Sequence, residues 1–224
     1  MSTSSELLDE IEHLLGPTLL PSLTSASRAS DLYQAYLFAT VCNAATAEGA
    51  TVRFRSIQSN TPAQFVFRTS PGLIGSTTHD YGYAVIEFEH KPPLEAHVGI
   101  RISGGSKVLH ECDICVLFSR EATRCRAYGL SMAPRASKVV LFVEAKFYTS
   151  HIGLLHGRAF LGLTADCGKP EGFFVINRTS ASIEKLLANK HKKWDHNIQP
   201  QNVADVNRLR NVLQSVFKDF KAEN

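Results

Sequence analysis

Hydrophobic residues recur along the chain with two periods, one typical of helices and one typical of strands. Residues 5–15 place apolar side chains on one face of a short amphipathic helix, and residues 202–221 repeat this pattern over a longer stretch. Residues 31–47 form a third predicted helix, with Ser30 as its N-cap and a glycine just after its end.

Shorter apolar runs predict strands, because strand side chains alternate between two faces. The runs 83–89 and 97–102 alternate apolar and polar residues, as expected for a half-exposed antiparallel pair. The predicted strands are 52–57, 64–67, 83–89, 97–102, 108–118, 138–147 and 172–176, with two further helices at 153–164 and from Ser180 or Ser182 to about 187. Residues 69–82 and 119–137 are expected to be irregular, and residues 190–194 to form a basic turn.

The order of these elements predicts an α/β or α+β fold with a mixed central β-sheet flanked by helices. A chain of 224 residues suits one domain. We therefore expect residues 1–224 to form a single domain with its core at about 30–190. The helices 5–15 and 202–221 would be appendages to that core.

Composition narrows the class of protein. Hydrophobic residues make up 44% of the sequence, which is enough for a core, and a formal net charge of +3 does not by itself indicate a nucleic-acid-binding surface. The N-terminus has no basic stretch followed by an apolar core, and no apolar run has the length of a membrane helix. Five scattered cysteines favour a reduced protein. We expect a cytoplasmic protein with no membrane partner.

Two charged residues interrupt the apolar run 139–148, which reads VVLFVEAKFY. The run predicts a buried strand, and Glu144 and Lys146 are two residues apart, so they share one face of it. A buried charge is costly unless it is paired or holds a metal ion. The pair is therefore either an ion pair at the rim of the sheet or part of a functional site.

A second predicted strand also carries charges in its middle. Residues 107–118 read KVLHECDICVLF, and Glu111 and Asp113 share one face. If this strand pairs with 138–147, then Asp113, Glu144 and Lys146 converge at one end of the sheet. Two converging carboxylates repel each other unless a cation lies between them, and oxygen ligands suit Mg²⁺ or Mn²⁺.

This arrangement resembles the PD-(D/E)XK nuclease superfamily, whose members have the restriction-endonuclease-like fold. The resemblance covers about residues 30–190 and rests on Asp113, on Glu144-x-Lys146 at the end of an apolar strand, and on the helix and strand that follow. It implies metal-dependent cleavage of phosphodiester bonds in nucleic acid, usually DNA. Asp113 and Glu144 would bind Mg²⁺ or Mn²⁺, and Lys146 would position or activate the water. One departure is Cys112, which stands before Asp113 in place of a proline.

Three more residues are candidates for the same site. Many members of the superfamily carry an acidic residue on the helix before the sheet, where this chain has Gln34, whose carbonyl oxygen could reach a water or a metal ion. Glu111 could add a carboxylate or form a salt bridge at the edge of the sheet. Arg158, on the helix after the motif, could bind a phosphate or pair with a carboxylate.

Other interpretations stay open. The chain could be a catalytically inactive module of the same fold that binds nucleic acid or a partner protein, because a fold does not fix a function. The charges could also be a structural ion-pair cluster. Cys112 and Cys115 form a CxxC, but no second pair follows for a zinc site, and we expect the two to face opposite sides of their strand. An active enzyme could serve restriction, defence against foreign DNA or repair, as a homodimer joined through the terminal helices or with a partner protein.

Overall fold

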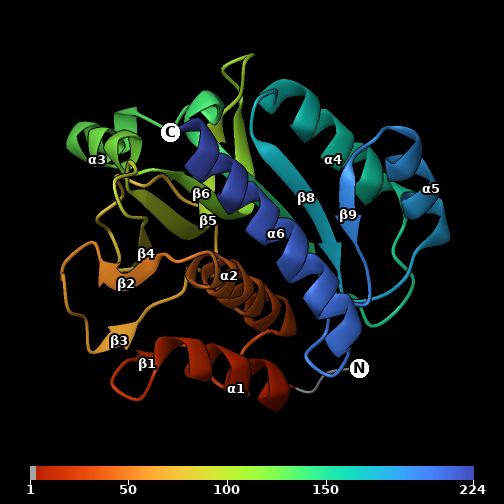
Figure 1. The fold of residues 1–224 in the computed structure, drawn as a ribbon, viewed down its shortest axis with the longest axis horizontal. Helices are drawn as coiled ribbons and strands as arrows, with labels where there is room; N and C mark the ends of the chain where they lie inside the picture. Colours follow the sequence, from red (N-terminus) through yellow and green to blue (C-terminus); the bar gives the residue numbers. More distant parts are fainter. Residues whose placement is uncertain (1–3) are drawn as a thin grey trace.

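The computed structural model describes residues 4–224. Its centre is a seven-stranded sheet with the strand order β2-β4-β5-β6-β7-β8-β9, and helices cover it (Figure 1). The prediction of an α/β fold with a mixed central sheet flanked by helices is therefore confirmed. None of the helices within residues 4–224 is both long enough and apolar enough to cross a membrane.

The helices and strands have the following bounds. The helices are α1 (Ser4–Leu15), α2 (Ala29–Ala47), α3 (Ser119–Tyr128), α4 (Leu154–Cys167), α5 (Ala181–Asn189) and α6 (Val203–Glu223), with short 3₁₀ turns at Gly129–Ser131 and Ala136–Lys138. The strands are β1 (Leu20–Pro21), β2 (Thr51–Ser56), β3 (Gln64–Phe65), β4 (Gly82–Glu87), β5 (Leu94–Ser103), β6 (Leu109–Phe118), β7 (Val139–Lys146), β8 (Glu171–Ile176) and β9 (Lys193–Asp195).

The direction of the strands changes across the sheet. Strands β2, β4, β5, β6 and β7 pair with antiparallel neighbours, whereas β7, β8 and β9 run parallel to one another. Parallel neighbours need a crossover connection, and α4 and α5 supply the two crossovers. The ends of β7 and β8 therefore point the same way, which places Lys146 opposite Ile176 at one edge of the sheet.

Two apolar cores lie on the two faces of the sheet. One contains side chains from α1, α2 and α6, and the other contains side chains from α3, α4 and α5. Figure 1 shows α6 crossing in front of the sheet, with α1 beside α2 below it. The apolar stripes of α1 and α6, which we expected could join two copies of the chain, are buried in the chain's own core.

Some predicted elements were wrong. Residues 119–137 contain the helix α3. Arg126 of this helix pairs with Glu95 on β5, and Glu121 of this helix pairs with Arg135 in the segment before β7, so ion pairs hold a polar segment in place. The predicted basic turn ends in β9, which pairs with β8. The pair β4 and β5 is antiparallel as expected but almost fully buried, since helices cover both of its faces. Helix α2 begins at Ala29 with Arg28 as its N-cap residue, so Ser30 is not the cap.

Strands β5 and β6 both change face near the middle. On β5, Val98 packs in the core of α2 while Ile100 packs in the opposite core, and Gly99 between them has a φ of +61°, which glycine adopts readily. On β6, Ile114 packs in the core of α2 and Cys112 packs in the opposite core, with Asp113 between them. This change of face also corrects the prediction for the CxxC, because Cys112 and Cys115 lie in the same core.

Candidate active site

The site begins where β6 and β7 stop pairing. Their last matched pair at this end is Ile114 with Val143, and Asp113 and Glu144 come directly after it. The Asp113 carboxylate, which is 5% exposed, accepts a hydrogen bond from the backbone N–H of Ala145 through Oδ2 at 2.8 Å. The Asp113 side chain thus replaces a backbone hydrogen bond between the two strands and holds the end of β7 next to β6.

Lys146 joins the two carboxylates. Its Nζ lies 2.6 Å from Glu144 Oε1 and 3.5 Å from Asp113 Oδ2. The side chains of Glu144 and Lys146 are 21% and 20% exposed, so water reaches them while Asp113 lies behind them. The three residues predicted to converge at this end of the sheet do converge.

Gln34 belongs to the same cluster. It projects from α2, and its Nε2 donates a hydrogen bond to Asp113 Oδ1 at 2.9 Å. Each oxygen of the Asp113 carboxylate therefore has its own donor, one from the helix and one from the strand. Gln34 meets the site through its amide N–H rather than through the carbonyl oxygen that we expected to bind water or metal.

The charges of the cluster shift the pKa values of its members. Burial, and then repulsion by Glu144, raise the pKa of Asp113 to about 6, and Lys146 offsets only part of this rise. Burial alone would lower the pKa of Lys146, but Asp113 and Glu144 outweigh it and raise that pKa. The ammonium group is therefore held in its charged form between two carboxylates that repel each other.

These oxygen donors fit a hard divalent cation that keeps part of its water shell. Mg²⁺ is commonly held by one or two carboxylates together with waters and substrate phosphates. Asp113 and Glu144 provide two such carboxylates, and residues 4–224 contain no group of three or more His, Cys, Asp or Glu side chains placed to hold a metal ion. Two carboxylates would leave the remaining coordination positions of such a cation to water.

Neither of the other two predicted candidates, Glu111 and Arg158, forms a hydrogen bond or ion pair with the cluster among the described residues. Glu111 is exposed on β6, where burial and then the charge of Asp113 raise its pKa, while Lys146 and Arg101 lower it. Its carboxylate is close enough to share the field of the site, but it forms no ion pair among the described residues. Arg158 is exposed on α4 and likewise has no carboxylate partner within residues 4–224, so its guanidinium is open to solvent.

Sequence reasoning missed Asn177, which fixes the segment after Lys146. Asn177 is fully buried, its Oδ1 accepts from Tyr148 N at 2.9 Å, and its Nδ2 donates to Tyr148 O at 3.1 Å. Its backbone N–H also donates to Lys146 O at 3.2 Å. The signal in the sequence was an asparagine directly after the apolar strand β8, where its side chain can hold the neighbouring strand end.

The aromatic side chain after the motif extends the site toward α4. The Tyr148 hydroxyl lies 2.8 Å from His156 Nε2, and burial, followed by the charge of Lys146, lowers the pKa of His156. A neutral imidazole therefore lies at the edge of the charged cluster.

Comparisons with known proteins leave the chain without an assigned family. No protein-family model matches it, and neither the curated proteins nor the solved structures contain a match.

Proposed function

We propose that this protein is a Mg²⁺- or Mn²⁺-dependent nuclease of the PD-(D/E)XK type that hydrolyses phosphodiester bonds in DNA. The observation that carries the proposal is the convergence of Asp113, Glu144 and Lys146 at the point where β6 and β7 stop pairing. Partly buried ion pairs usually add little to the stability of a fold. The cluster has one more carboxylate than ammonium group, and this excess negative charge suits a site that binds a cation.

Each residue of the cluster has a role in this proposal. Asp113 and Glu144 would hold the cation, which when bound lowers the pKa of a water and offsets negative charge on the phosphate. Lys146 would orient the attacking water and stabilise the charge that develops on the phosphate. The water oxygen would form a bond to phosphorus and give up a proton to the solvent. The bond from phosphorus to the leaving sugar oxygen would break, and that oxygen would take up a proton from the solvent.

The same proposal covers partners and location. One such site cuts one strand, so cleavage of both strands would use a second copy or a partner protein. All five cysteines are free and buried, as suits a reducing, intracellular compartment. Restriction, defence against foreign DNA and repair are the processes that an intracellular DNA nuclease would serve.

A second candidate is a catalytically inactive module that binds nucleic acid or a partner protein. The observation that favours it is Gln34, which places an amide beside Asp113 where a third carboxylate would strengthen a metal site. Under this alternative the protein would bind its partner without cutting nucleic acid.

A cleavage assay tests the proposal. Linear duplex, supercoiled and single-stranded DNA, and RNA, are incubated with the protein in Mg²⁺, Mn²⁺ or EDTA. We expect cutting of DNA that EDTA abolishes and that Glu144→Gln loses. The matched control is Glu171→Gln on β8, whose exposed carboxylate pairs with Lys193 at 2.9 Å, and it should cut normally.

Metal binding separates the alternatives. Titration calorimetry with Mn²⁺ should give binding that Glu144→Gln weakens. If the folded protein binds no divalent ion and cuts no nucleic acid, then Asp113, Glu144 and Lys146 form a structural ion-pair cluster and the nuclease proposal is wrong. Nucleic-acid binding without cutting under any metal condition would favour the inactive module.

A further inference from the structure

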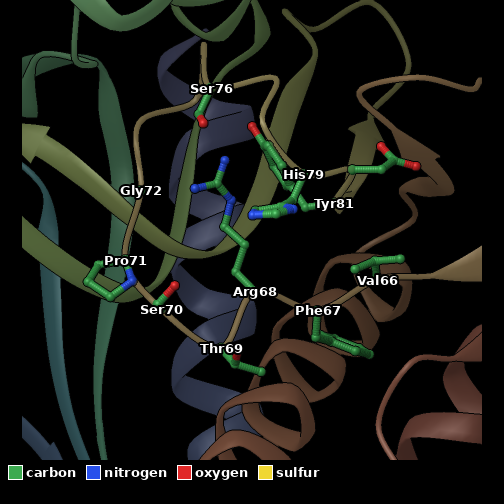
Figure 2. Close-up of a pocket in the computed structure, with 11 residues that line it drawn as sticks. Val66, Phe67, Arg68, Thr69, Ser70, Pro71, Gly72, Ser76, His79 and Tyr81 are labelled. Carbon is green, nitrogen blue, oxygen red and sulfur yellow. The ribbon is translucent and has the colours of Figure 1, made fainter.

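A cavity of about 310 Å³ lies within the segment that joins β3 to β4. It is lined by residues 66–72 and by Ser76, His79, Asp80 and Tyr81, and the Arg68 side chain extends into its middle (Figure 2). Its volume is at the lower end of the range of roughly 300–1,000 Å³ that is usual for small-molecule sites. It has room for one phosphate group and part of an attached sugar rather than for a large ligand.

Backbone hydrogen bonds tie this cavity to the strand next to Asp113. Gly72 N donates to Gly99 O at 3.0 Å, and Arg101 N donates to Gly72 O at 3.0 Å, so the loop extends the sheet alongside β5. Gly99 lies between two matched positions of β5 and β6, which places it opposite Asp113. Gly72 is therefore two strand spacings, or about 10 Å, from the strand that carries Asp113.

Arg68 is the cationic group of this cavity. Its guanidinium carbon lies 3.6 Å from the centre of the Tyr81 ring, and its Nη2 donates to Leu73 O at 3.0 Å. The Nε atom is buried and has no hydrogen-bond partner among the described residues. A guanidinium offers five N–H donors, so Arg68 is held in place with donor capacity left over.

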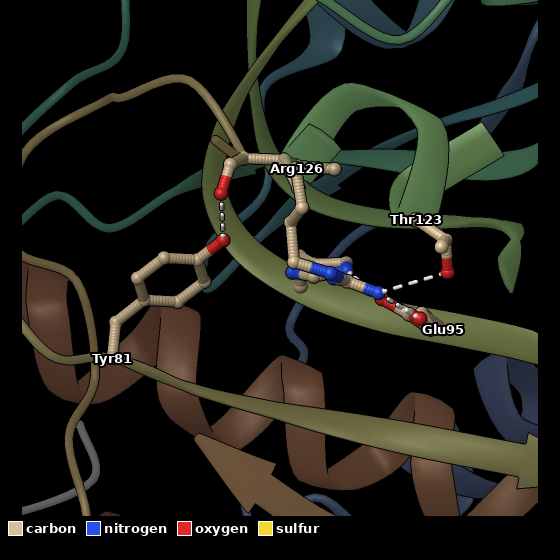
Figure 3. Close-up of polar contacts among 6 residues, drawn as sticks. Tyr81, Glu95, Thr123 and Arg126 are labelled. Atoms are coloured by element: carbon tan, nitrogen blue, oxygen red, sulfur yellow. Dashed lines mark hydrogen bonds and ion pairs between the residues drawn. The ribbon is translucent and has the colours of Figure 1, made fainter. Parts of the chain in front are cut away.

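Arg126 differs from Arg68 because it is paired with a carboxylate. Arg126 donates two hydrogen bonds to Glu95, at 2.6 and 2.8 Å, so its charge is neutralised within the protein (Figure 3). Tyr81, which stacks on Arg68, is fixed from behind because its hydroxyl donates to Ile74 O at 2.8 Å (Figure 3). Arg68 forms no ion pair with a carboxylate within residues 4–224, so its positive charge remains available to a ligand.

The rest of the lining suits a phosphate. The hydroxyl groups of Thr69, Ser70 and Ser76 and the ring of His79 can donate hydrogen bonds to its oxygens. The lining also includes one carboxylate, Asp80, whose Oδ1 accepts a hydrogen bond from Gln58 N at 3.3 Å.

Because Gly72 has no side chain, there is room beside it for the guanidinium of Arg68. A Cβ at this position would lie 1.8 Å from Arg68 Nη1, so any larger residue would displace the arginine.

We propose that Arg68 and its cavity bind a backbone phosphate of the nucleic-acid substrate, a few nucleotides from the bond that the Asp113 site cuts. Guanidinium binds phosphate through paired hydrogen bonds. Gly72, in the lining of this cavity, lies about 10 Å from the strand that carries Asp113, so one bound strand with about 3.4 Å per nucleotide could contact both groups. This inference rests on the proposed nuclease function and adds to it a contact that is independent of base sequence.

The test is oligonucleotide binding in a Lys146→Met background, measured by fluorescence anisotropy over a range of salt concentrations. Arg68→Gln should weaken binding about tenfold to a hundredfold, to a similar extent for unrelated sequences, and should reduce the salt slope by about one charge. The matched control is Arg120→Gln, an exposed arginine on α3 at the opposite end of the sheet, and its affinity should be unchanged.

Arg68→Lys serves as the second variant, because it keeps the positive charge if the loss of the guanidinium disturbs folding. It should fold and bind with an affinity between those of the parent and Arg68→Gln. Circular dichroism and thermal denaturation establish that each variant is folded before binding is compared.

The outcomes are distinct. A folded Arg68→Gln variant that binds with the affinity and salt slope of its parent would overturn this inference, and cleavage by the wild type would still test the nuclease proposal separately. Binding of AMP or inorganic phosphate that depends on Arg68, without an effect on oligonucleotide binding, would overturn it in favour of a free phosphate ligand. A wild type that neither binds nor cuts nucleic acid would overturn both proposals.

Discussion

The two oxygens of Asp113 are held by donors from separate elements. Gln34 on α2 binds one oxygen, and the backbone of Ala145 on β7 binds the other, while Lys146 lies 3.5 Å away. Burial and the repulsion of Glu144 still raise the pKa of Asp113 to about 6. The carboxylate is therefore precisely positioned but not fully compensated in charge, as a group that shares a cation would be.

Replacing Gln34 by glutamate tests that view at the level of one residue. Gln34→Glu removes a hydrogen bond to a charged group and adds a third carboxylate, so in EDTA we expect the free energy of unfolding to fall by about 1.5–3 kcal/mol. Mg²⁺ or Mn²⁺ should then raise the melting temperature more than in the wild type, because a cation that binds the folded state stabilises it. Differential scanning calorimetry measures both effects.

Gln34→Leu is the control, since it also removes the hydrogen bond but adds no charge. Its melting temperature should fall in EDTA without a larger response to the metal. Equal metal responses in Gln34→Glu, Gln34→Leu and the wild type would mean that no cation binds next to Asp113.

Asn177 gives a second prediction at this scale. Asn177→Ala leaves the backbone N–H and C=O of Tyr148 without their partners, so the free energy of unfolding should fall by about 2–4 kcal/mol. Urea denaturation should show a lower midpoint at an unchanged slope. Asn189→Ala, at the exposed end of α5, is the control and should leave the midpoint in place. A midpoint as high as that of the wild type would show that these two bonds do not hold the segment after Lys146.

At the scale of an element, β5 carries buried charges that the candidate site does not use. Glu95 and His97 are 3% and 0% exposed, and Glu95 Oε2 lies 3.0 Å from His97 Nε2 and 2.8 Å from the guanidinium of Arg126. Burial lowers the pKa of His97 below 6.5, although Glu95 raises it in part. Burial raises the pKa of Glu95, but His97 and Arg126 outweigh it and lower that pKa below 4.5.

The lowered pKa of His97 makes stability depend on pH. At a pH between the pKa of His97 in the folded chain and its pKa of 6.5 in the unfolded chain, the unfolded chain binds more protons at this residue. The free energy of unfolding therefore falls as the pH drops below 6.5. Glu95 adds a further loss only below pH 4.5. Asp113 has the opposite sign, because its raised pKa makes acidification from about 6 toward 3.8 favour the folded state.

A comparison of variants isolates the His97 effect from that of Asp113. The free energy of unfolding should fall more steeply between pH 7 and 5 in the wild type than in His97→Gln, with the slopes differing by at most about 1.4 kcal/mol per pH unit. His90→Gln, which removes an exposed histidine, should keep the wild-type slope. Urea titrations at each pH measure the slopes, and identical slopes in wild type and His97→Gln would contradict the account.

The elements that could not be predicted are those held by distant partners. Helix α3 has only Glu121, Ala122 and Cys125 buried, so it lacks an apolar stripe, and its position depends on ion pairs to β5 and to the segment before β7. Strand β9 has three residues and exists because it pairs with β8. The hydrophobic periodicity within each segment does not predict either contact. The long helices and the apolar strands, which bury a clear face, were predictable.

At the scale of the whole molecule, the candidate site could be predicted only in part. Alternation along two strands was enough to predict that Asp113, Glu144 and Lys146 converge, because the strands pair as expected. The change of face around Gly99 and Asp113 depends on a backbone conformation that alternation does not encode. The position of Arg68 depends on a loop that joins the sheet edge through backbone hydrogen bonds.

We propose that the cluster at the point where β6 and β7 stop pairing cuts nucleic acid, and single-turnover DNA cleavage in saturating Mg²⁺ tests this proposal most directly. Lys146→Met should reduce the rate about 10²–10³-fold at unchanged folding, since it removes the group that would stabilise the developing charge. Lys185→Met, an exposed lysine on α5, should cut at the wild-type rate. Equal rates for Lys146→Met and the wild type, or no Mg²⁺-dependent cutting by the folded wild type, would contradict the account.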